Sequence, residues 1–167
     1  SQLLAATNKE IDTINESCQS VLNPDSPTLH VIFGDSVYPT KYKVNDPIIF
    51  TSNIWKLNIQ NGKFGEIIEV AQNWKFNDEG RKVAALIGDD DAVFGKIRME
   101  DGEIIHINHE TIDHFRLAHC ISVHKAQGSQ FDKVIAILGR NKIVDRDWIY
   151  TSITRAKDSV HIVDPGK

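Results

Sequence analysis

The segment with the most evident potential for chemistry spans residues 122–132, where eight of eleven residues are polar or glycine. Ser122, His124 and Lys125 carry donors that suit phosphate oxygens, and Gly128 allows a backbone amide to approach a ligand closely. A polar segment between two apolar runs is more often a plain connecting loop. Composition alone therefore leaves both interpretations open.

A second candidate segment, residues 150–157, reads Tyr-Thr-Ser-Ile-Thr-Arg-Ala-Lys. Its polar residues Thr154, Arg155 and Lys157 fall at the end of a predicted helix, opposite its apolar side. A single arginine in that position is usually a solvated charge or a partner for the helix dipole. Its weight as a functional residue thus depends on what accompanies it elsewhere in the chain.

The elements expected to position both segments are alternating strands and helices. Apolar runs predict strands at 117–121, 134–138 and 160–163, and a 3.6-residue period predicts a helix at 147–156. Continuous apolar strands alternating with helices are typical of a parallel sheet. Ligands bind beyond the carboxyl ends of such strands, which is where the segment 122–132 begins.

The N-terminal part predicts one more strand and helix of the same layer. A short apolar run at 3–6 precedes Thr7 and Glu10, whose spacing fits a helix capping box. The helix is expected to end before Asn23-Pro24. Residues 23–43 contain three prolines and no clear period, which predicts loops and one short element at 29–33.

The middle of the chain is typical of β-structure. Alternation at Trp55, Leu57 and Ile59, and turn signals at Asn61-Gly62 and Asp101-Gly102, predict four or five short strands and a small barrel. We interpret the acidic run 89–91 as a solvated loop tip. The histidines of this region have no cysteine or carboxylate at zinc-ligand spacing.

Composition limits the possible classes of protein. The 167 residues carry a net charge of −4, distributed as −2 over residues 1–44, −6 over 45–115 and +4 over 116–161, so a polyanion would contact the last part. Cys18 and Cys120 lie in apolar segments, which indicates buried thiols and a reducing, cytoplasmic location. No apolar run is long enough to span a membrane. The single methionine, Met99, suggests that the chain is cut from a longer protein.

Taken together, the two polar segments resemble the fifth and sixth motifs of superfamily 1 helicases, because His-Lys-Ala-Gln-Gly-Ser at 124–129 precedes Thr-Arg-Ala-Lys at 154–157 by about 25 residues. Residues 4–8 and the pair Ile14-Asn15 look like the fourth motif of the branch that contains RecD-like and conjugative relaxase helicases. Asn-Gly-x-x-Gly at 61–65 is similar to the entry to that branch's inserted barrel.

The resemblance implies an α/β fold: a RecA-like parallel-sheet domain of the P-loop NTPase type, without the P-loop, at 1–45 and 115–167. An SH3-like β-barrel is expected as an insertion at 46–114. The implied function is the C-terminal fragment of an ATP-dependent DNA helicase that moves 5′ to 3′ on single-stranded DNA. ATP and Mg²⁺ would serve the intact parent, and the fragment alone is expected to bind neither and to be inactive.

The resemblance also implies residue roles. Arg155 would be the arginine finger that reaches the γ-phosphate across the cleft to an N-terminal RecA-like domain of the same parent chain. Single-stranded DNA would be held through its phosphates by Ser122, His124 and Lys125. The other ATP-contacting residues would lie in both motifs, at Gln127, Gly128, Gln130 and Thr154.

Departures from the family pattern limit these roles. Position 130 is Gln where the family commonly has Glu, and only Asn8 and Lys9 occupy the place of a fourth-motif arginine. No Gly-x-x-x-x-Gly-Lys-Ser/Thr loop occurs in the 167 residues. Two alternatives stay open: a non-catalytic module that binds nucleic acid or protein through an SH3-like barrel, and a relative of RNA helicases.

Overall fold

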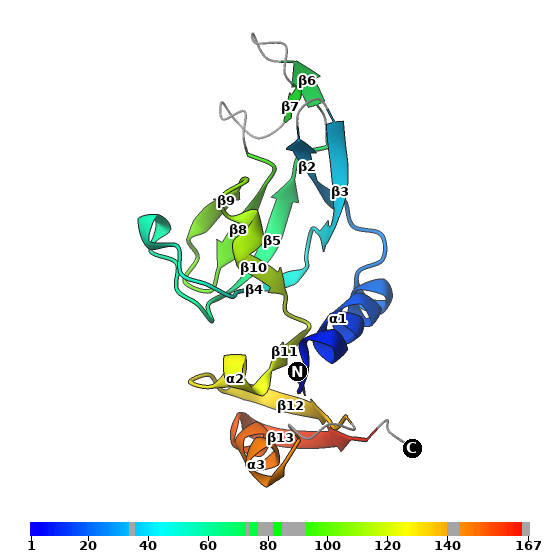
Figure 1. Ribbon diagram of the computed structural model, residues 1–167, viewed down its shortest axis with the longest axis vertical. Coiled ribbons are helices and arrows are strands. Elements are labelled where there is room, and N and C mark those ends of the chain that lie inside the picture. Colours follow the sequence, from blue (N-terminus) through cyan, green and yellow to red (C-terminus); the bar gives the residue numbers. More distant parts are fainter. Residues whose placement is uncertain (34–35, 73, 77–81, 85–92, 140–143, 165–167) are drawn as a thin grey trace. The chain divides into compact units, whose positions relative to one another are not determined.

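The computed structural model describes residues 1–33, 36–72, 74–76, 82–84, 93–139 and 144–164. The chain divides into two compact units (Figure 1). Unit 1 consists of Ser1–Leu22 and Ala118–Lys167, and unit 2 of Asn23–Leu117. The acidic run at 89–91 lies outside the described residues. The described part of the chain has no helix that is long and apolar enough to cross a membrane.

Unit 1 is built on a four-stranded sheet in which every neighbouring pair of strands is parallel. Its order is β11-β1-β12-β13, and the strands are β1 (Gln2–Ala5), β11 (Cys120–Ser122), β12 (Phe131–Ile137) and β13 (Ala156–Val163). Leu3 in the second strand aligns with Cys120 on one side and with Ile135 on the other. The mixed α/β layer predicted from the sequence is therefore confirmed.

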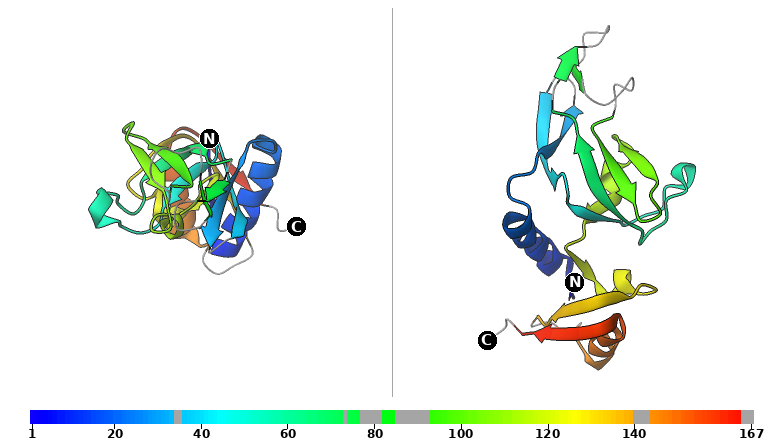
Figure 2. Two further views of the ribbon diagram at one scale, coloured as in Figure 1. Left: turned by 90° about the horizontal axis from the view of Figure 1, so that it is seen from above. Right: turned by 180° about the vertical axis from the view of Figure 1, so that it is seen from behind.

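Three helices accompany this sheet: α1 (Asn8–Leu22), α2 (Val123–Ala126) and α3 (Arg146–Thr154). α1 contacts β1 and β11, and α3 contacts β12 and β13. The strands β12 and β13 run side by side in Figure 1 and in the right-hand view of Figure 2. Thr7 begins α1 as predicted, because its hydroxyl accepts from the Glu10 amide at 3.2 Å and donates to the Glu10 carboxylate at 2.9 Å. The predicted cap by Thr7 and the end of the helix before Asn23 are confirmed, and the Glu10 carboxylate bonds the Thr7 hydroxyl.

Two predictions for unit 1 are wrong in detail. The helix expected at 147–156 ends at Thr154, and Ala156 already pairs with Phe131 as the first residue of β13. The apolar run expected as one strand at 117–121 is divided between two sheets. Leu117 ends β10 (Phe115–Leu117) in unit 2, whereas Cys120 begins β11 in unit 1. Ala118 and His119 join them, so the break between the units falls inside this run.

Unit 2 contains a five-stranded antiparallel sheet of order β10-β4-β5-β8-β9. The further strands of this sheet are β4 (Pro47–Phe50), β5 (Phe64–Val70), β8 (Gly95–Met99) and β9 (Ile104–Ile107). Among the described residues, seventeen buried ones form the core of unit 2, including Phe50, Ile67 and Phe94. The 3₁₀ turn η2 (Ile112–His114) precedes β10, and a short hairpin joins β6 (Trp74–Phe76) to β7 (Lys82–Ala84).

Two further segments of unit 2 differ from expectation. The segment expected as loops at 23–43 forms an antiparallel hairpin of β2 (Thr28–Phe33) and β3 (Ser36–Lys43), although the short element predicted at 29–33 is present. The alternation at 55–59 is not a strand. Residues Trp55–Leu57 form a 3₁₀ turn, η1, closed by two backbone hydrogen bonds between Ile54 and Ile59.

Candidate functional site

The first predicted segment begins at the carboxyl end of β11, where Ser122 starts helix α2. Its hydroxyl accepts a hydrogen bond from the Lys125 amide at 3.0 Å and so caps the helix. His124 is exposed and Lys125 is half-buried on this single turn of helix. The cap leaves the hydroxyl proton of Ser122 available for donation, so all three side chains predicted to contact phosphate stand on one short, capped element.

The second half of the segment leaves this end of the sheet. Gly128 adopts φ +82°, and a Cβ at this position would meet no atom within 4 Å. The left-handed backbone, rather than lack of space, therefore accounts for glycine. After this turn the chain reaches Phe131, the first residue of β12. Only the beginning of the segment therefore lies beyond the carboxyl end of β11, and residues 127–130 connect α2 to the amino end of β12.

Arg155 stands at that same end of the sheet. It is the residue after α3, and its carbonyl accepts from the Phe131 amide at 2.8 Å. This bond holds Arg155 beside Gln130, the residue before Phe131. Thr154 is fixed through its hydroxyl, which donates to the Thr151 carbonyl at 3.0 Å. The pairing of β12 with β13 therefore brings residues of both predicted motifs together.

The guanidinium of Arg155 has few partners. One Nη donates to the Thr154 hydroxyl at 3.5 Å, whereas the Nε is buried without an acceptor. Within the described ranges no carboxylate forms an ion pair with this side chain. A buried N–H without an acceptor is costly in a folded protein, and such groups are rare. The positive charge is available to an anion.

Ser122 and Arg155 lie at different ends of the sheet. Ser122 aligns with Ala5 in the pairing of β11 with β1, and Leu4 aligns with Ala136 in the pairing of β1 with β12. Ser122 therefore lies at the level of Ile137, the last residue of β12. Six residue steps along β12 separate that level from Phe131, which corresponds to about 20 Å at the usual rise of a strand. Ser122 is therefore at the opposite end of the sheet from Phe131, whereas α2, which carries His124 and Lys125, contacts α3, the helix that precedes Arg155.

One residue of this site had no chemical role in the sequence-based prediction. Asn15 of α1 is only 3% exposed. Its carboxamide accepts from the Cys120 amide at 2.8 Å and donates to the Cys120 carbonyl at 3.0 Å. Asn15 thereby gives hydrogen-bond partners to the Cys120 backbone in β11, the edge strand that leads directly to Ser122. The available signal was a polar residue on the same helix face as Ile11.

The cysteines and the acidic residues of the described chain add no chemistry of their own. Burial, with smaller contributions from Cys18 and Glu10, raises the pKa of Cys120 to about 12, and burial also raises the pKa of Cys18. Both thiols therefore stay protonated near neutral pH. Among the described residues no group of three His, Cys, Asp or Glu side chains could hold a metal ion.

Comparison with known proteins adds a family to this geometry. The UvrD-like helicase C-terminal domain family matches residues 117–163, a range that contains every predicted site residue. The chain is also 29% identical over 132 residues to RecBCD enzyme subunit RecD of Mycolicibacterium smegmatis and 22% identical over 150 residues to the ATP-dependent RecD2 DNA helicase of Deinococcus radiodurans. The chain is a RecD-like C-terminal domain of the superfamily 1 helicases.

These alignments cover 78% and 89% of the RecD-like domain, but only 20% and 17% of the two relatives. The chain thus spans about a fifth of the length of these relatives. RecD of Buchnera aphidicola is 31% identical over 121 residues, which make up 71% of the chain and 17% of that relative.

Solved structures support the fold of the RecD-like domain. A Bacteroides Pif1 helicase in complex with ADP-AlF3 and single-stranded DNA covers 98% of the chain with a TM-score of 0.62 and 16% identity, and the chain covers 40% of it. The Candida albicans Pif1 helicase covers 97% with a TM-score of 0.59 and 18% identity, and 44% of it is covered. The mixed α/β architecture with a parallel sheet matches a RecA-like helicase domain.

Proposed function

We propose that the chain is the C-terminal motor domain of an ATP-dependent DNA helicase that moves 5′ to 3′ along single-stranded DNA. In this proposal unit 1 forms the second RecA-like domain and closes on an N-terminal RecA-like domain of the same parent chain. The antiparallel sheet of unit 2 belongs to an inserted SH3-like barrel. The observation that carries the proposal is the guanidinium of Arg155, whose buried Nε has no acceptor among the described residues, on a residue that the backbone holds beside the fifth-motif residue Gln130.

The group around Arg155 is proposed to face ATP. A fixed guanidinium stabilises the negative charge that develops on the transferred phosphoryl group, and such a residue contributes about 10³–10⁵ in rate. The side-chain amides of Gln127 and Gln130, the hydroxyl of Thr154 and the exposed backbone at Gly128 supply neutral donors and acceptors for the rest of the nucleotide. The buried Nε of Arg155 supports this assignment, because an incoming phosphate oxygen would give it an acceptor.

Magnesium fits this unit less well than the nucleotide does. The described residues contain no cluster of carboxylates for a divalent cation, and the sequence has no phosphate-binding glycine loop. Mg²⁺ and the phosphate cradle are therefore assigned to the N-terminal domain of the parent. This chain would contribute the positive charge of Arg155, which contacts the γ-phosphate when the cleft closes. Alone, the chain would bind neither ATP nor Mg²⁺.

The group on α2 is proposed to hold the DNA backbone. The Ser122 hydroxyl and the side chains of His124 and Lys125 can each donate to a phosphate oxygen. Asn15 fixes the strand that carries them, and the continuous segment 122–131 joins this group to the nucleotide group. A movement of the Arg155 end on cleft closure would therefore be passed to the DNA-contacting helix.

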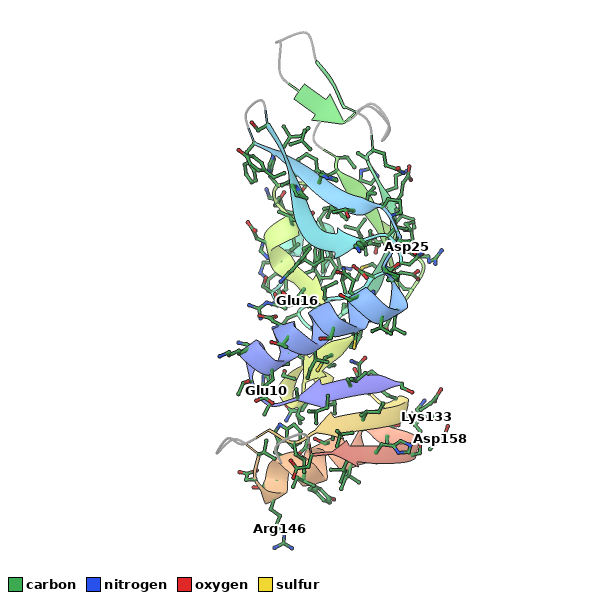
Figure 3. The ribbon with its side chains drawn as sticks, turned by 90° about the vertical axis from the view of Figure 1, so that its right-hand side faces the viewer. Glu10, Glu16, Asp25, Lys133, Arg146 and Asp158 are labelled. Atoms are coloured by element: carbon green, nitrogen blue, oxygen red, sulfur yellow. The ribbon has the colours of Figure 1, made fainter. Side chains whose placement is uncertain are left out.

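ATP hydrolysis by the intact parent protein tests the nucleotide assignment. We expect Arg155→Ala to lower DNA-stimulated ATPase activity by two or more decades and to leave DNA affinity within about twofold. Arg155→Lys keeps the charge but not the planar fork, and should recover only part of the activity. Arg146→Ala is the matched control, because Arg146 extends from the start of the same helix into solvent (Figure 3). Unchanged turnover in Arg155→Ala, or robust turnover by the 167-residue chain alone, would refute the assignment.

The salt dependence of DNA binding tests the second group. We expect Lys125→Ala in the parent protein to weaken binding to single-stranded DNA and to reduce the slope of log affinity against log salt by about 0.7, the loss of one phosphate contact. Lys133→Ala is the control, because this lysine is an exposed residue of β12 and not of α2. An unaltered slope in Lys125→Ala would remove Lys125 from the DNA contact.

A further inference from the structure

The strand β9 is the last strand of the five-stranded sheet of unit 2 among the described residues. It pairs with β8 on its inner side, where the Met99 amide donates to the Glu103 carbonyl at 2.8 Å. Bonded and non-bonded pairs alternate along an antiparallel ladder, so every second residue counted from Glu103 bonds toward β8. Ile104 and His106 lie between these residues, and their backbone groups therefore form the outer edge of β9.

Three of the four backbone groups on this outer edge have no partner. The fourth is the His106 carbonyl, which accepts from the Thr111 hydroxyl at 3.2 Å. The amides of Ile104 and His106 and the carbonyl of Ile104 form no hydrogen bond within the part of the chain that the structure describes. An unpaired edge of this kind is a template for a further strand, and proteins usually cover it.

A groove of about 490 Å³ lies between β9 and the turn η1, and we call it the η1–β9 groove. The loop that carries η1 lies beside β9 in Figure 1, and it supplies Lys56, Leu57 and Asn58 as one wall. Ile54 and Ile59, on either side of η1, are buried in the core of unit 2. The groove is therefore formed before a ligand binds, and its volume falls within the range of ligand clefts, about 300–1,000 Å³.

Two exposed apolar side chains line the groove. Ile104 on β9 is 45% exposed, and Leu57 on the opposite wall is 37% exposed. Apolar side chains beside unpaired backbone groups suit an extended polypeptide that adds to a sheet as a strand. In this mode the backbone hydrogen bonds supply affinity, and pockets for alternate side chains supply specificity.

The segment that carries β9 is acidic. Residues 100–113 contain no lysine or arginine and five carboxylates, which are Glu100, Asp101, Glu103, Glu110 and Asp113. Glu103 lines the groove itself. Lys56 on the opposite wall is paired with Glu110 at 3.7 Å. The charge around the groove therefore disfavours a polyanion and is complementary to a polypeptide that carries basic residues.

We propose that the η1–β9 groove binds an extended, basic segment of a separate partner protein, which adds to the outer edge of β9 as a further strand. The Ile104 carbonyl accepts from the added strand, and the amides of Ile104 and His106 donate to it. Apolar side chains at alternate positions pack on Ile104 and Leu57, and basic side chains lie near Glu103. The inference goes beyond the proposed function, since neither ATP nor DNA takes part in this contact.

Fluorescence anisotropy of a labelled peptide, Lys-Val-Lys-Val-Lys-Val-Lys, mixed with the full 167-residue chain tests the groove. We expect saturable binding at low salt, and no binding by the peptide that has Glu in place of each Lys. Methylation of the backbone nitrogens at alternate peptide residues removes the donors from one edge of the peptide at a time. One alternate set of methyl groups should abolish binding, and the other should leave the affinity within about twofold.

Variants of the chain locate the bound peptide. Glu103→Lys should weaken binding about five- to tenfold, because it replaces an attraction with a repulsion. Glu100→Lys is the matched control, since Glu100 is an exposed carboxylate of the same segment that does not line the groove. Ile104→Pro should abolish binding but leave the ladder with β8 intact, because proline is tolerated where the missing N–H faces solvent. Circular dichroism checks that each variant folds.

Hydrogen exchange in the wild type gives a measurement that needs no variant. The amides of Ile104 and His106 should exchange at least about tenfold more slowly with the peptide bound. Absence of saturable binding, equal binding of the acidic peptide, equal effects of the two methylation patterns, or unchanged exchange at these amides would each overturn the proposal. Displacement of the peptide by oligo-dT would assign the groove to nucleic acid instead, and a concentration-dependent dimer that Ile104→Pro abolishes would assign it to a second copy of the chain. None of these outcomes alters the predictions for Arg155 and Lys125.

Discussion

Replacement of Asn15 tests how unit 1 holds its DNA-contacting strand. Asn15→Leu keeps a side chain of similar volume but removes both hydrogen bonds to Cys120. Each hydrogen bond contributes about 1 kcal/mol net, and each buried backbone group left without a partner adds a penalty of about 1–3 kcal/mol. Partial relaxation brings the expected loss of stability to about 2–5 kcal/mol, because β11 is an edge strand and water can reach part of it.

Native-state hydrogen exchange at the amides of β1 and β12 measures this loss in unit 1 alone. A destabilisation of about 2–5 kcal/mol corresponds to exchange that is about 30-fold to several thousand-fold faster for the most protected amides. Asn15→Asp should be at least as harmful, since it buries a carboxylate that cannot donate to the Cys120 carbonyl. Glu16→Ala on the exposed side of the same helix is the control and should change stability by less than about 0.5 kcal/mol. Wild-type exchange in Asn15→Leu would show that the carboxamide does not hold β11.

Two further predictions concern the thiols and the core of unit 2. Cys120 should resist alkylation by iodoacetamide at pH 8 in the folded protein while Cys18 reacts first, as measured by mass spectrometry, because burial raises the pKa of Cys120 to about 12. An unfolded thiol ionises near 9.0 whereas the folded Cys120 stays protonated, so this residue should make unfolding easier as pH rises from 9 to 12. Preferential labelling of Cys120 would contradict this. Gly95→Ala should destabilise unit 2 by about 1–3 kcal/mol in urea unfolding, because its Cβ would lie 2.7 Å from the Glu69 carbonyl oxygen. Gly62→Ala should also lose stability, but through its φ of +92° rather than through a clash, because no atom lies within 4 Å of the new Cβ. Wild-type urea stability in Gly95→Ala would exclude the clash.

Local patterns predicted those parts of unit 1 that depend on neighbouring residues. The spacing of Thr7 and Glu10 predicts the start of α1, and the apolar run at 134–138 predicts a buried strand without reference to the rest of the chain. The division of 117–121 between two sheets could not be predicted, because Leu117 and Cys120 are equally apolar and only their distant partners Ile48 and Leu3 differ. The end of α3 at Thr154 has a similar origin, since pairing with β12 recruits Ala156 into a strand.

The predicted site shows the same limit. Motif spacing predicted site roles for Gln130 and Arg155, but the proximity of these residues depends on the parallel pairing of β12 and β13 rather than on their separation in the sequence. The role of Asn15 depends on how α1 docks against an edge strand. The hairpin of β2 and β3 was missed because Pro39 and a bulge near Lys43 obscure the alternation of the strands. Phe33 and Tyr38 are also exposed, although they share one side of the strands with the buried Val31.

The insertion of unit 2 between α1 and β11 sets an order for folding. Leu3 pairs directly with Cys120, so the sheet of unit 1 closes a loop that contains all of unit 2. Loop-closure entropy grows with the logarithm of the free chain length, and a unit 2 that has already folded shortens this loop by about fivefold, which lowers the entropic cost by about 1–2 kcal/mol. During synthesis β1 and α1 must wait for β11 while unit 2 completes its own contacts. Variants that slow the folding of unit 2 should therefore delay unit 1 as well, and the exposed edge of β1 would be the surface most open to aggregation during that delay.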